Sequence, residues 1–311
     1  MSDQRYYLVE FAHVHVDFQV PEVASCLETF GLHSKCTVHP LPSQTFLPCK
    51  LTEFIAQMRS KGEVIKQTPH RSFIILSFTS WTENDHEEEV EEERNIISAL
   101  TQCVLVRGII ELWGAAADLQ ACANRVKQFI LETNAGTYGG KLVKKHCIEN
   151  AKSWKFTVAT IGSKCSREEQ NEMRSNFSYL PFSGNVIMDG PDEEYVLIKE
   201  VELDECGSPL FPRLDHAGKL ISENDARPPL AVYFGRVLGG GRNLRDRLLK
   251  YNLKGRAYLG PTSMDNELSM IMTNLAQVLK HYSFDIQNYF CTPFFCQCCQ
   301  PNLSIIPFVS F

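Results

Sequence analysis

Short segments with the alternating pattern of β-strands follow segments with helical periodicity along the first 234 residues, and this order constrains the fold most strongly. The strand-like segments are residues 6–18, 73–78, 104–112, 156–161, 196–203 and 230–234. The helix-like segments are residues 21–30, 51–60, 96–100, 116–131 and 167–175. Because each element must bury its apolar side against another, the order predicts helices layered on a sheet, which is the α/β (α+β) class. A chain of 311 residues is long enough for two such domains.

The acidic residues are unevenly distributed along the chain. A run without Lys or Arg occupies residues 83–93, and its acids are Glu83, Asp85, Glu87, Glu88, Glu89, Glu91, Glu92 and Glu93. Without these eight acids the formal net charge of −6 would be +2, so the overall acidity does not exclude a nucleic-acid ligand. The run is typical of a solvated face. It fits either a helix start, where the dipole favours acids, or a flexible linker.

A basic run follows three consecutive glycines at residues 239–241. It comprises Arg242, Arg245, Arg247, Lys250, Lys254 and Arg256, with Asp246 as the single acid among them. A glycine-rich turn before a helix can hold phosphate, but three consecutive glycines are more simply interpreted as a flexible turn. Lys and Arg at this density suit phosphate neutralisation, and a solvated basic face is the alternative.

The cysteines indicate a reducing compartment. There are 12 of them, eight scattered through residues 26–206, and the N-terminus lacks the basic and apolar segments of a signal peptide. We therefore expect a cytoplasmic protein whose scattered cysteines are small buried apolar residues. No segment has the uninterrupted apolar composition of a membrane-spanning helix.

Two groups of residues have the side chains of metal ligands. His13, His15 and Asp17 alternate along the first strand-like segment, and we interpret their shared face as the solvated face of that strand. The second group lies within nine residues near the C-terminus, with no further His or Cys pair nearby, and its members are Cys291, Cys296, Cys298 and Cys299. A structural zinc site usually takes two ligand pairs separated by a loop, so we predict no metal site.

Several motifs carry a resemblance to a known family. The strongest are Tyr233-Phe-Gly-Arg236, Leu253-Lys-Gly-Arg256, and Tyr258-Leu-Gly-Pro-Thr-Ser-Met-Asp265 continuing to Asn274. Further matches are Ile110-Glu-Leu-Trp-Gly114, Leu180-Pro-Phe182 and residues 10–23. Over residues 5–280 the chain resembles the catalytic subunit of the THUMP-domain tRNA (guanine-10, N2) methyltransferases.

The resemblance implies an order of domains. It places an N-terminal ferredoxin-like unit at residues 1–82, an acidic linker or helix start at 83–95, and a THUMP-like RNA-binding domain at 96–206. Residues 207–280 would be a connector and the start of a Rossmann-type methyltransferase domain. The complete enzymes of the family transfer a methyl group from S-adenosylmethionine to a guanine amine of tRNA. A small zinc-binding activator subunit usually covers their methyltransferase domain.

The sequence departs from the family after Asn274. The cofactor loop Asp-Pro-x-x-Gly-Thr-Gly and the catalytic loop Asp-Pro-Pro-Tyr occur nowhere in it, so only the first helix of the Rossmann-type domain is expected. Residues 281–311 contain no Lys, Arg or Glu and are rich in Phe and Cys, which indicates an unrelated tail, either of a truncated isoform or of an incorrect gene model. We therefore expect tRNA binding without catalysis by this chain alone, and no bound cofactor.

The sequence predicts the following site residues. The tRNA contacts are Arg236, Arg242, Arg245, Arg247, Lys250, Lys254 and Arg256, with Lys141, Lys144 and Lys145 as a second basic cluster. Thr262 and Ser263 would line the cofactor pocket of a complete enzyme. Two alternatives remain: a working methyltransferase assembled in trans, and a metal-binding interaction protein that uses the C-terminal cysteines.

Overall fold

The computed structural model describes residues 4–42, 47–60, 72–79, 86–131, 142–149, 153–163, 165–201, 230–240 and 264–277. Its strands are β1 (Gln4–Phe11), β2 (Cys36–His39), β3 (Cys49–Lys50), β4 (Phe73–Thr79), β5 (Val106–Ala116), β6 (Ser153–Ile161), β7 (Asn185–Val186), β8 (Glu193–Glu200) and β9 (Ala231–Gly240). Its helices are α1 (Val16–Thr29), the 3₁₀-helix η1 (His33–Lys35), α2 (Leu51–Ser60), α3 (His86–Gln102), α4 (Leu119–Leu131), the π-helix η3 (Lys144–Glu149), α6 (Arg167–Ser175) and α8 (Asn266–Leu275).

Within these residues the strands form one nine-stranded sheet in the order β3-β2-β4-β1-β5-β9-β8-β6-β7. Strand β9 pairs antiparallel with β5 on one side and with β8 on the other, although it follows both in sequence. Strand β6 pairs in parallel with β8 and with the short edge strand β7. The mixed sheet with its helices confirms the α/β (α+β) class predicted from the sequence.

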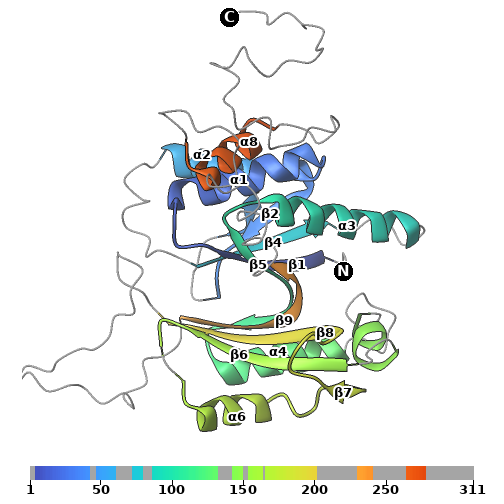
Figure 1. Ribbon diagram of the computed structural model, residues 1–311. Coiled ribbons are helices and arrows are strands. Elements are labelled where there is room, and N and C mark those ends of the chain that lie inside the picture. Colours follow the sequence, from blue (N-terminus) through green and yellow to red (C-terminus); the bar gives the residue numbers. More distant parts are fainter. Residues whose placement is uncertain are drawn as a thin grey trace, which may run out of the picture.

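The helices cover the sheet in two groups. Helices α1, α2 and α3 lie over the N-terminal half of the sheet, with α8 docked on α1, and α4 and α6 cover the other half, against β5, β9 and β6 (Figure 1). Ile109 and Trp113 lie on the same face of β5. Ile109 belongs to the apolar core beneath the first group of helices, and Trp113 belongs to the core beneath the second group. Ile110 points to the opposite face, into a third apolar cluster with Leu8 and Tyr233.

The first strand and the first helix differ from the prediction. Strand β1 ends at Phe11, and His15 adopts a left-handed conformation (φ 49°) that turns the chain into α1 at Val16. The prediction that His13, His15 and Asp17 share one strand face is therefore wrong, because Asp17 lies in the first turn of a helix. The alternation up to residue 18 hid a helical pattern that buries Val20, Val23 and Leu27.

Two other segments also differ from the prediction. No strand is predicted among residues 31–50, which contain β2 and β3. The turn expected at residues 239–241 is wrong for Gly239 and Gly240, which belong to β9 and pair with Ile109 and Gly108. Gly241 and the basic run that follows it lie outside the described residues.

Helix α3 includes most of the acidic run. Among the acids whose side chains are described, Glu91 is exposed and contacts Arg94, whereas Glu92 is buried and lies 3.3 Å from Lys35 Nζ. The run is therefore partly internal and is not a uniformly solvated face. None of the helices in the described ranges combines the length and the apolar character needed to cross a membrane.

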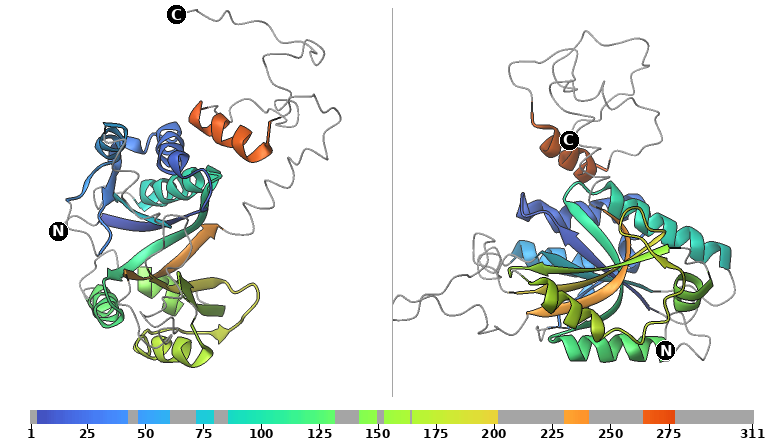
Figure 2. Two further views of the ribbon diagram at one scale, coloured as in Figure 1. Left: turned by 90° about the vertical axis from the view of Figure 1, so that its left-hand side faces the viewer. Right: turned by 60° about the horizontal axis from the view of Figure 1, so that its bottom comes forward.

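Helix α8 docks on α1 through buried polar contacts (Figure 2). Asn274 Nδ2 donates to Glu22 Oε1 at 2.7 Å, and the same carboxylate accepts from the backbone N–H groups of Val104 and Leu105 at 2.8 and 3.0 Å. Ile271 packs against Val104 and Leu105 beside this contact. The contact ties α8, α1 and the α3–β5 connection together.

Replacing Asn274 with Ala is expected to lower the free energy of unfolding by about 1–3 kcal/mol, because the fully buried Glu22 carboxylate loses a hydrogen-bond donor. Urea denaturation followed by circular dichroism measures this loss. Gln277→Ala is the control, since it removes only an exposed hydrogen bond to Glu28 at the end of α8. Equal losses from the two variants would contradict the role of Asn274.

Candidate functional site

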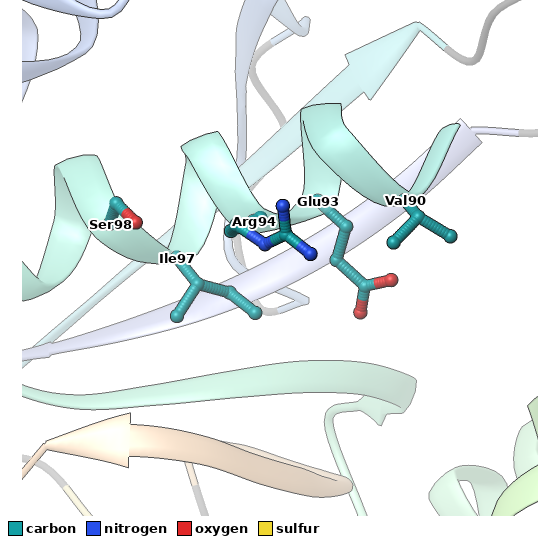
Figure 3. A pocket seen from close by; sticks show the side chains of 5 residues that line it. All are labelled: Val90, Glu93, Arg94, Ile97 and Ser98. Atoms are coloured by element: carbon teal, nitrogen blue, oxygen red, sulfur yellow. The ribbon is translucent and has the colours of Figure 1, made fainter. Parts of the chain in front are cut away.

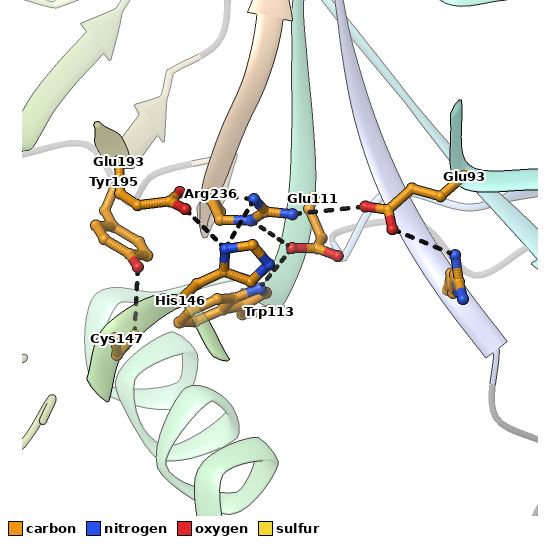
Figure 4. A network of polar contacts seen from close by, with 9 residues as sticks. Glu93, Glu111, Trp113, His146, Cys147, Glu193, Tyr195 and Arg236 are labelled. Carbon is orange, nitrogen blue, oxygen red and sulfur yellow. Dashed lines mark hydrogen bonds and ion pairs between the residues drawn. The ribbon is translucent and has the colours of Figure 1, made fainter. Parts of the chain in front are cut away.

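A cluster of six charged or titratable residues lies between the two cores, on the helix-covered side of the sheet (Figure 4). We call it the polar seam; its members are Arg5 of β1, Glu93 of α3, Glu111 of β5, His146 of η3, Glu193 of β8 and Arg236 of β9. Each member comes from a different element. The polar seam therefore joins segments that lie far apart in the sequence.

Arg236 is the centre of the polar seam. Its Nε lies 2.9 Å from Glu111 Oε2, and its terminal nitrogens lie 3.5 Å from Glu193 and from Glu93. Arg236 is 8% exposed and Glu111 only 2%. Burial alone would lower the pKa of Arg236, but the carboxylates of Glu111, Glu193 and Glu93 raise it above its ordinary value. Arg236 is thus a fixed internal cation that holds three acidic side chains.

This position differs from the one expected for a tRNA contact. The sequence predicts that Arg236 contacts tRNA together with the basic run, whereas the structure encloses its guanidinium among protein carboxylates. The reason is its register in β9: Arg236 shares a face with Phe234, which is fully buried. We therefore assign Arg236 a structural role within the polar seam and do not assign it to an exposed surface.

Glu93 links helix α3 to the sheet. One of its oxygens lies 3.5 Å from Arg236, and the other lies 3.7 Å from Arg5. Glu93 also lines a shallow, open depression of about 250 Å³ on α3, together with Val90, Arg94, Ile97 and Ser98 (Figure 3). One helix supplies all of these lining side chains, so the depression does not gather groups from different elements as an enclosed ligand site does.

His146 connects the π-helix η3 to the polar seam. Its Nδ1 lies 2.7 Å from Glu193 Oε1 and 3.3 Å from Arg236 Nη1. Because an ionised carboxylate can only accept, the shorter contact places a proton on Nδ1, which donates to Glu193. The contact with Arg236 is then not a hydrogen bond, since a guanidinium can only donate and the protonated Nδ1 cannot accept. Burial would raise the pKa of Glu193, but the hydrogen bond from His146 and the charge of Arg236 lower it below its ordinary value.

Cys147 lies next to the polar seam and is inert. Its Sγ is 3.3 Å from the hydroxyl of Tyr195, and burial raises its pKa to about 11. A thiol with this pKa carries little thiolate near neutral pH, so it is a poor nucleophile. The interpretation of the scattered cysteines as buried residues is confirmed for Cys26, Cys36, Cys103, Cys122 and Cys147, whereas Cys49 and Cys165 are half-buried.

The structure describes only some of the predicted contact residues. Lys144 and Lys145 are exposed on η3, and Arg236 lies in the polar seam. The following predicted residues lie outside the described residues: Lys141, Arg242, Arg245, Arg247, Lys250, Lys254, Arg256, Thr262, Ser263 and the four C-terminal cysteines. Among the residues that are described, no group of three or more His, Cys, Asp or Glu side chains could hold a metal ion.

Sequence reasoning missed the acidic members of the polar seam. In the sequence, Glu93 belongs to the acidic run, and Glu111 lies within the motif that begins at Ile110. The available signal was the position of Glu111 within β5, where it shares a face with Ile109 and Trp113. A carboxylate on a buried face needs a cationic or hydrogen-bonding partner, so such a residue points to an internal ion pair.

Comparison with known proteins gives consistent matches. Residues 88–242 match the family model described as the Tmrp11 THUMP N-terminal domain. The tRNA (guanine(10)-N(2))-methyltransferase TRMT11 of Homo sapiens is 25% identical over 272 residues, which cover 88% of this chain and 44% of that protein. The tRNA (guanine(10)-N(2))-methyltransferase of Saccharomyces cerevisiae is 29% identical over 198 residues, covering 61% and 37%. The chain spans less than half the length of these relatives.

Solved structures give weaker matches. TrmN from Thermus thermophilus covers 88% of this chain and 55% of its own, with 8% identity and a TM-score of 0.33. The match to a 4-thiouridine synthetase in complex with RNA and ATP covers 75% of this chain and 41% of the synthetase, with 11% identity and a TM-score of 0.30.

Proposed function

We propose that this chain, whose residues 88–242 belong to the Tmrp11 THUMP N-terminal domain family, binds tRNA. The family match carries the proposal, because it covers every element from α3 to β9 and includes all of the polar seam except Arg5. The names of the relatives support it, since each describes a protein that acts on tRNA. The reduced, mostly buried cysteines are compatible with a cytoplasmic location.

The proposed contact surface consists of Lys144 and Lys145 on η3 together with the basic residues that lie outside the described ranges. Both lysines are exposed, whereas Arg236 supports the fold from the polar seam. Lysine side chains bind phosphate mainly through charge, so they fix a nucleic-acid strand without reading its sequence. We therefore propose that most of the affinity for tRNA comes from its phosphates.

The affinity for tRNA is expected to fall linearly with salt concentration on a double logarithmic plot, because phosphate contacts release counterions. Replacing Lys144 and Lys145 with Ala should weaken binding and reduce that slope by about two, one for each phosphate that is no longer neutralised. Filter binding with labelled tRNA over a range of KCl concentrations measures both quantities. Arg59→Ala is the control, because it also removes an exposed cation, from α2, and should leave the affinity and the slope unchanged. An unchanged slope in the double variant would contradict the assignment.

Replacing Arg245 and Arg247 with Ala tests the basic run in the same assay. Both residues belong to the predicted run, although they lie outside the described residues. If the run contacts phosphates, the double variant binds tRNA more weakly than the unmodified chain.

We propose that methyl transfer requires residues that these 311 do not supply. The cofactor loop and the catalytic loop of the methyltransferases that this chain resembles do not occur in the sequence. The first would be needed to hold S-adenosylmethionine, and the second to hold the target amine. A continuation of the chain or a second protein would have to provide them, and the small zinc-binding activator would then contact that part. Titration calorimetry with S-adenosylmethionine tests this: saturable micromolar binding to this chain would refute it.

A further inference from the structure

The π-helix η3 has two faces of different character. On the inner face His146 is 9% exposed and Cys147 is fully buried. On the outer face Lys144 and Lys145 are exposed, and Ile148 is 52% exposed. A helix of six residues makes few internal hydrogen bonds, so contacts with the rest of the protein must fix its conformation.

The polar contacts of η3 described here come from segments that follow it in the sequence. Ser183 Oγ lies 2.7 and 2.8 Å from the carbonyl oxygens of Cys147 and Ile148, which share its single hydroxyl proton. Cys147 Sγ lies 3.3 Å from Tyr195 OH, and His146 Nδ1 lies 2.7 Å from Glu193 Oε1. The contact from His146 differs from the others because it involves a charged partner that belongs to the polar seam, and Glu193 is in turn 3.5 Å from Arg236.

The charges of the polar seam make the hydrogen bond from His146 important. Glu93, Glu111 and Glu193 supply three carboxylates, whereas Arg5 and Arg236 supply two guanidinium groups. Glu193 therefore shares Arg236 with two other acids and takes its shortest contact, at 2.7 Å, from the ring of His146. Without that ring, η3 would no longer be connected to the sheet through Glu193, and the partly buried carboxylate would have to reorient.

We propose that His146 is a positioning residue for tRNA binding, which holds Lys144 and Lys145 at the orientation in which they meet the phosphates. The inference rests on the proposed function. The two lysines directly precede His146, so a displacement of the histidine backbone moves both of them. A fixed backbone also lowers the entropy that lysine side chains lose when they bind.

A mutant cycle tests this inference. The variants are Lys144→Ala/Lys145→Ala, His146→Ala and the triple variant, and tRNA affinity is measured at several KCl concentrations for each. The lysine pair should lose about tenfold in affinity, as expected for two phosphate contacts. His146→Ala should weaken binding and reduce the salt slope although it removes no lysine. The triple variant should bind no more weakly than the lysine pair, because His146 acts only through those lysines.

Two further variants separate positioning from general stability. His146→Gln retains a side-chain N–H donor for Glu193 and should recover part of the affinity, whereas Glu193→Leu removes the acceptor altogether and should resemble His146→Ala. Urea midpoints, measured in parallel, identify any variant that binds weakly only because it unfolds. Arg59→Ala again controls for the loss of a cation.

The outcomes are distinguishable. If the lysine pair weakens binding but His146→Ala leaves the affinity and the slope unchanged, the inference is overturned and the proposed function stands. If the effects of His146→Ala and of the lysine pair multiply in the triple variant, His146 acts elsewhere and the inference is also overturned. If the unmodified chain does not bind tRNA, the proposed function fails and the inference fails with it.

Discussion

Replacing Arg236 with Met is expected to lower the free energy of unfolding by about 3–5 kcal/mol, because it removes one partner of a buried ion pair and leaves the other charged. Glu111 is only 2% exposed, and its Oε2 lies 2.9 Å from Arg236 Nε. Met retains an unbranched side chain comparable to the aliphatic stem of Arg and has no charge, so most of the loss would reflect the missing charged group. Urea denaturation at neutral pH, followed by circular dichroism, measures it.

Arg94→Met is the matched control for this variant. Arg94 also contacts a glutamate, Glu91, but its side chain is 67% exposed, and exposed pairs contribute about 0–1 kcal/mol. Combining Arg236→Met with Glu111→Gln should recover part of the lost stability, because the uncompensated carboxylate disappears. If Arg236→Met lowers the free energy of unfolding no more than Arg94→Met does, the polar seam does not stabilise the junction between the two cores.

Replacing Gly235 with Ala is expected to lower the free energy of unfolding by about 3 kcal/mol or more. This is the upper end of the range for substitutions that overpack an interior. A Cβ atom at this position would lie 2.1 Å from the backbone oxygen of Glu111 and 2.7 Å from Ile110 Cγ2. The backbone oxygen belongs to the neighbouring strand, so it cannot move without disturbing the pairing of β5 with β9. The yield of soluble protein and the urea midpoint both report this effect.

Gly190→Ala separates this clash from the general cost of replacing glycine. Gly190 has a positive φ of 66°, but nothing lies within 4 Å of a Cβ atom placed there. Its replacement should cost only backbone strain, about 1–2 kcal/mol. If the two variants were destabilised equally, close approach between β5 and β9 would not be the reason for Gly235.

Two helices could be predicted from the sequence together with their bounds. The bounds of α2 (residues 51–60) and α6 (residues 167–175) agree with the prediction. Ser166 begins α6 with a capping box to Glu169, which is a purely local signal. The strands β2 and β3 could not be predicted, because each has few residues and exists by pairing with a neighbour distant in sequence.

The candidate site was only partly predictable. Counting basic residues grouped Arg236 with the run that follows it, since charge density does not show which way a side chain points. The register of β9 puts Arg236 and Phe234 on one buried face, and its pairing with β5 places Glu111 opposite Arg236. That pairing joins residues 125 positions apart, so no local pattern could reveal it.

The central position of β9 determines when the sheet can be completed during synthesis. Strands β5 and β8 are both translated before β9, yet each has β9 as a neighbour in the sheet. Until residue 240 has left the ribosome, the edges of β5 and β8 that will receive β9 have unpaired backbone groups. Native pairing of these strands is therefore a late event, and a nascent chain halted before residue 231 would be prone to aggregation through those edges.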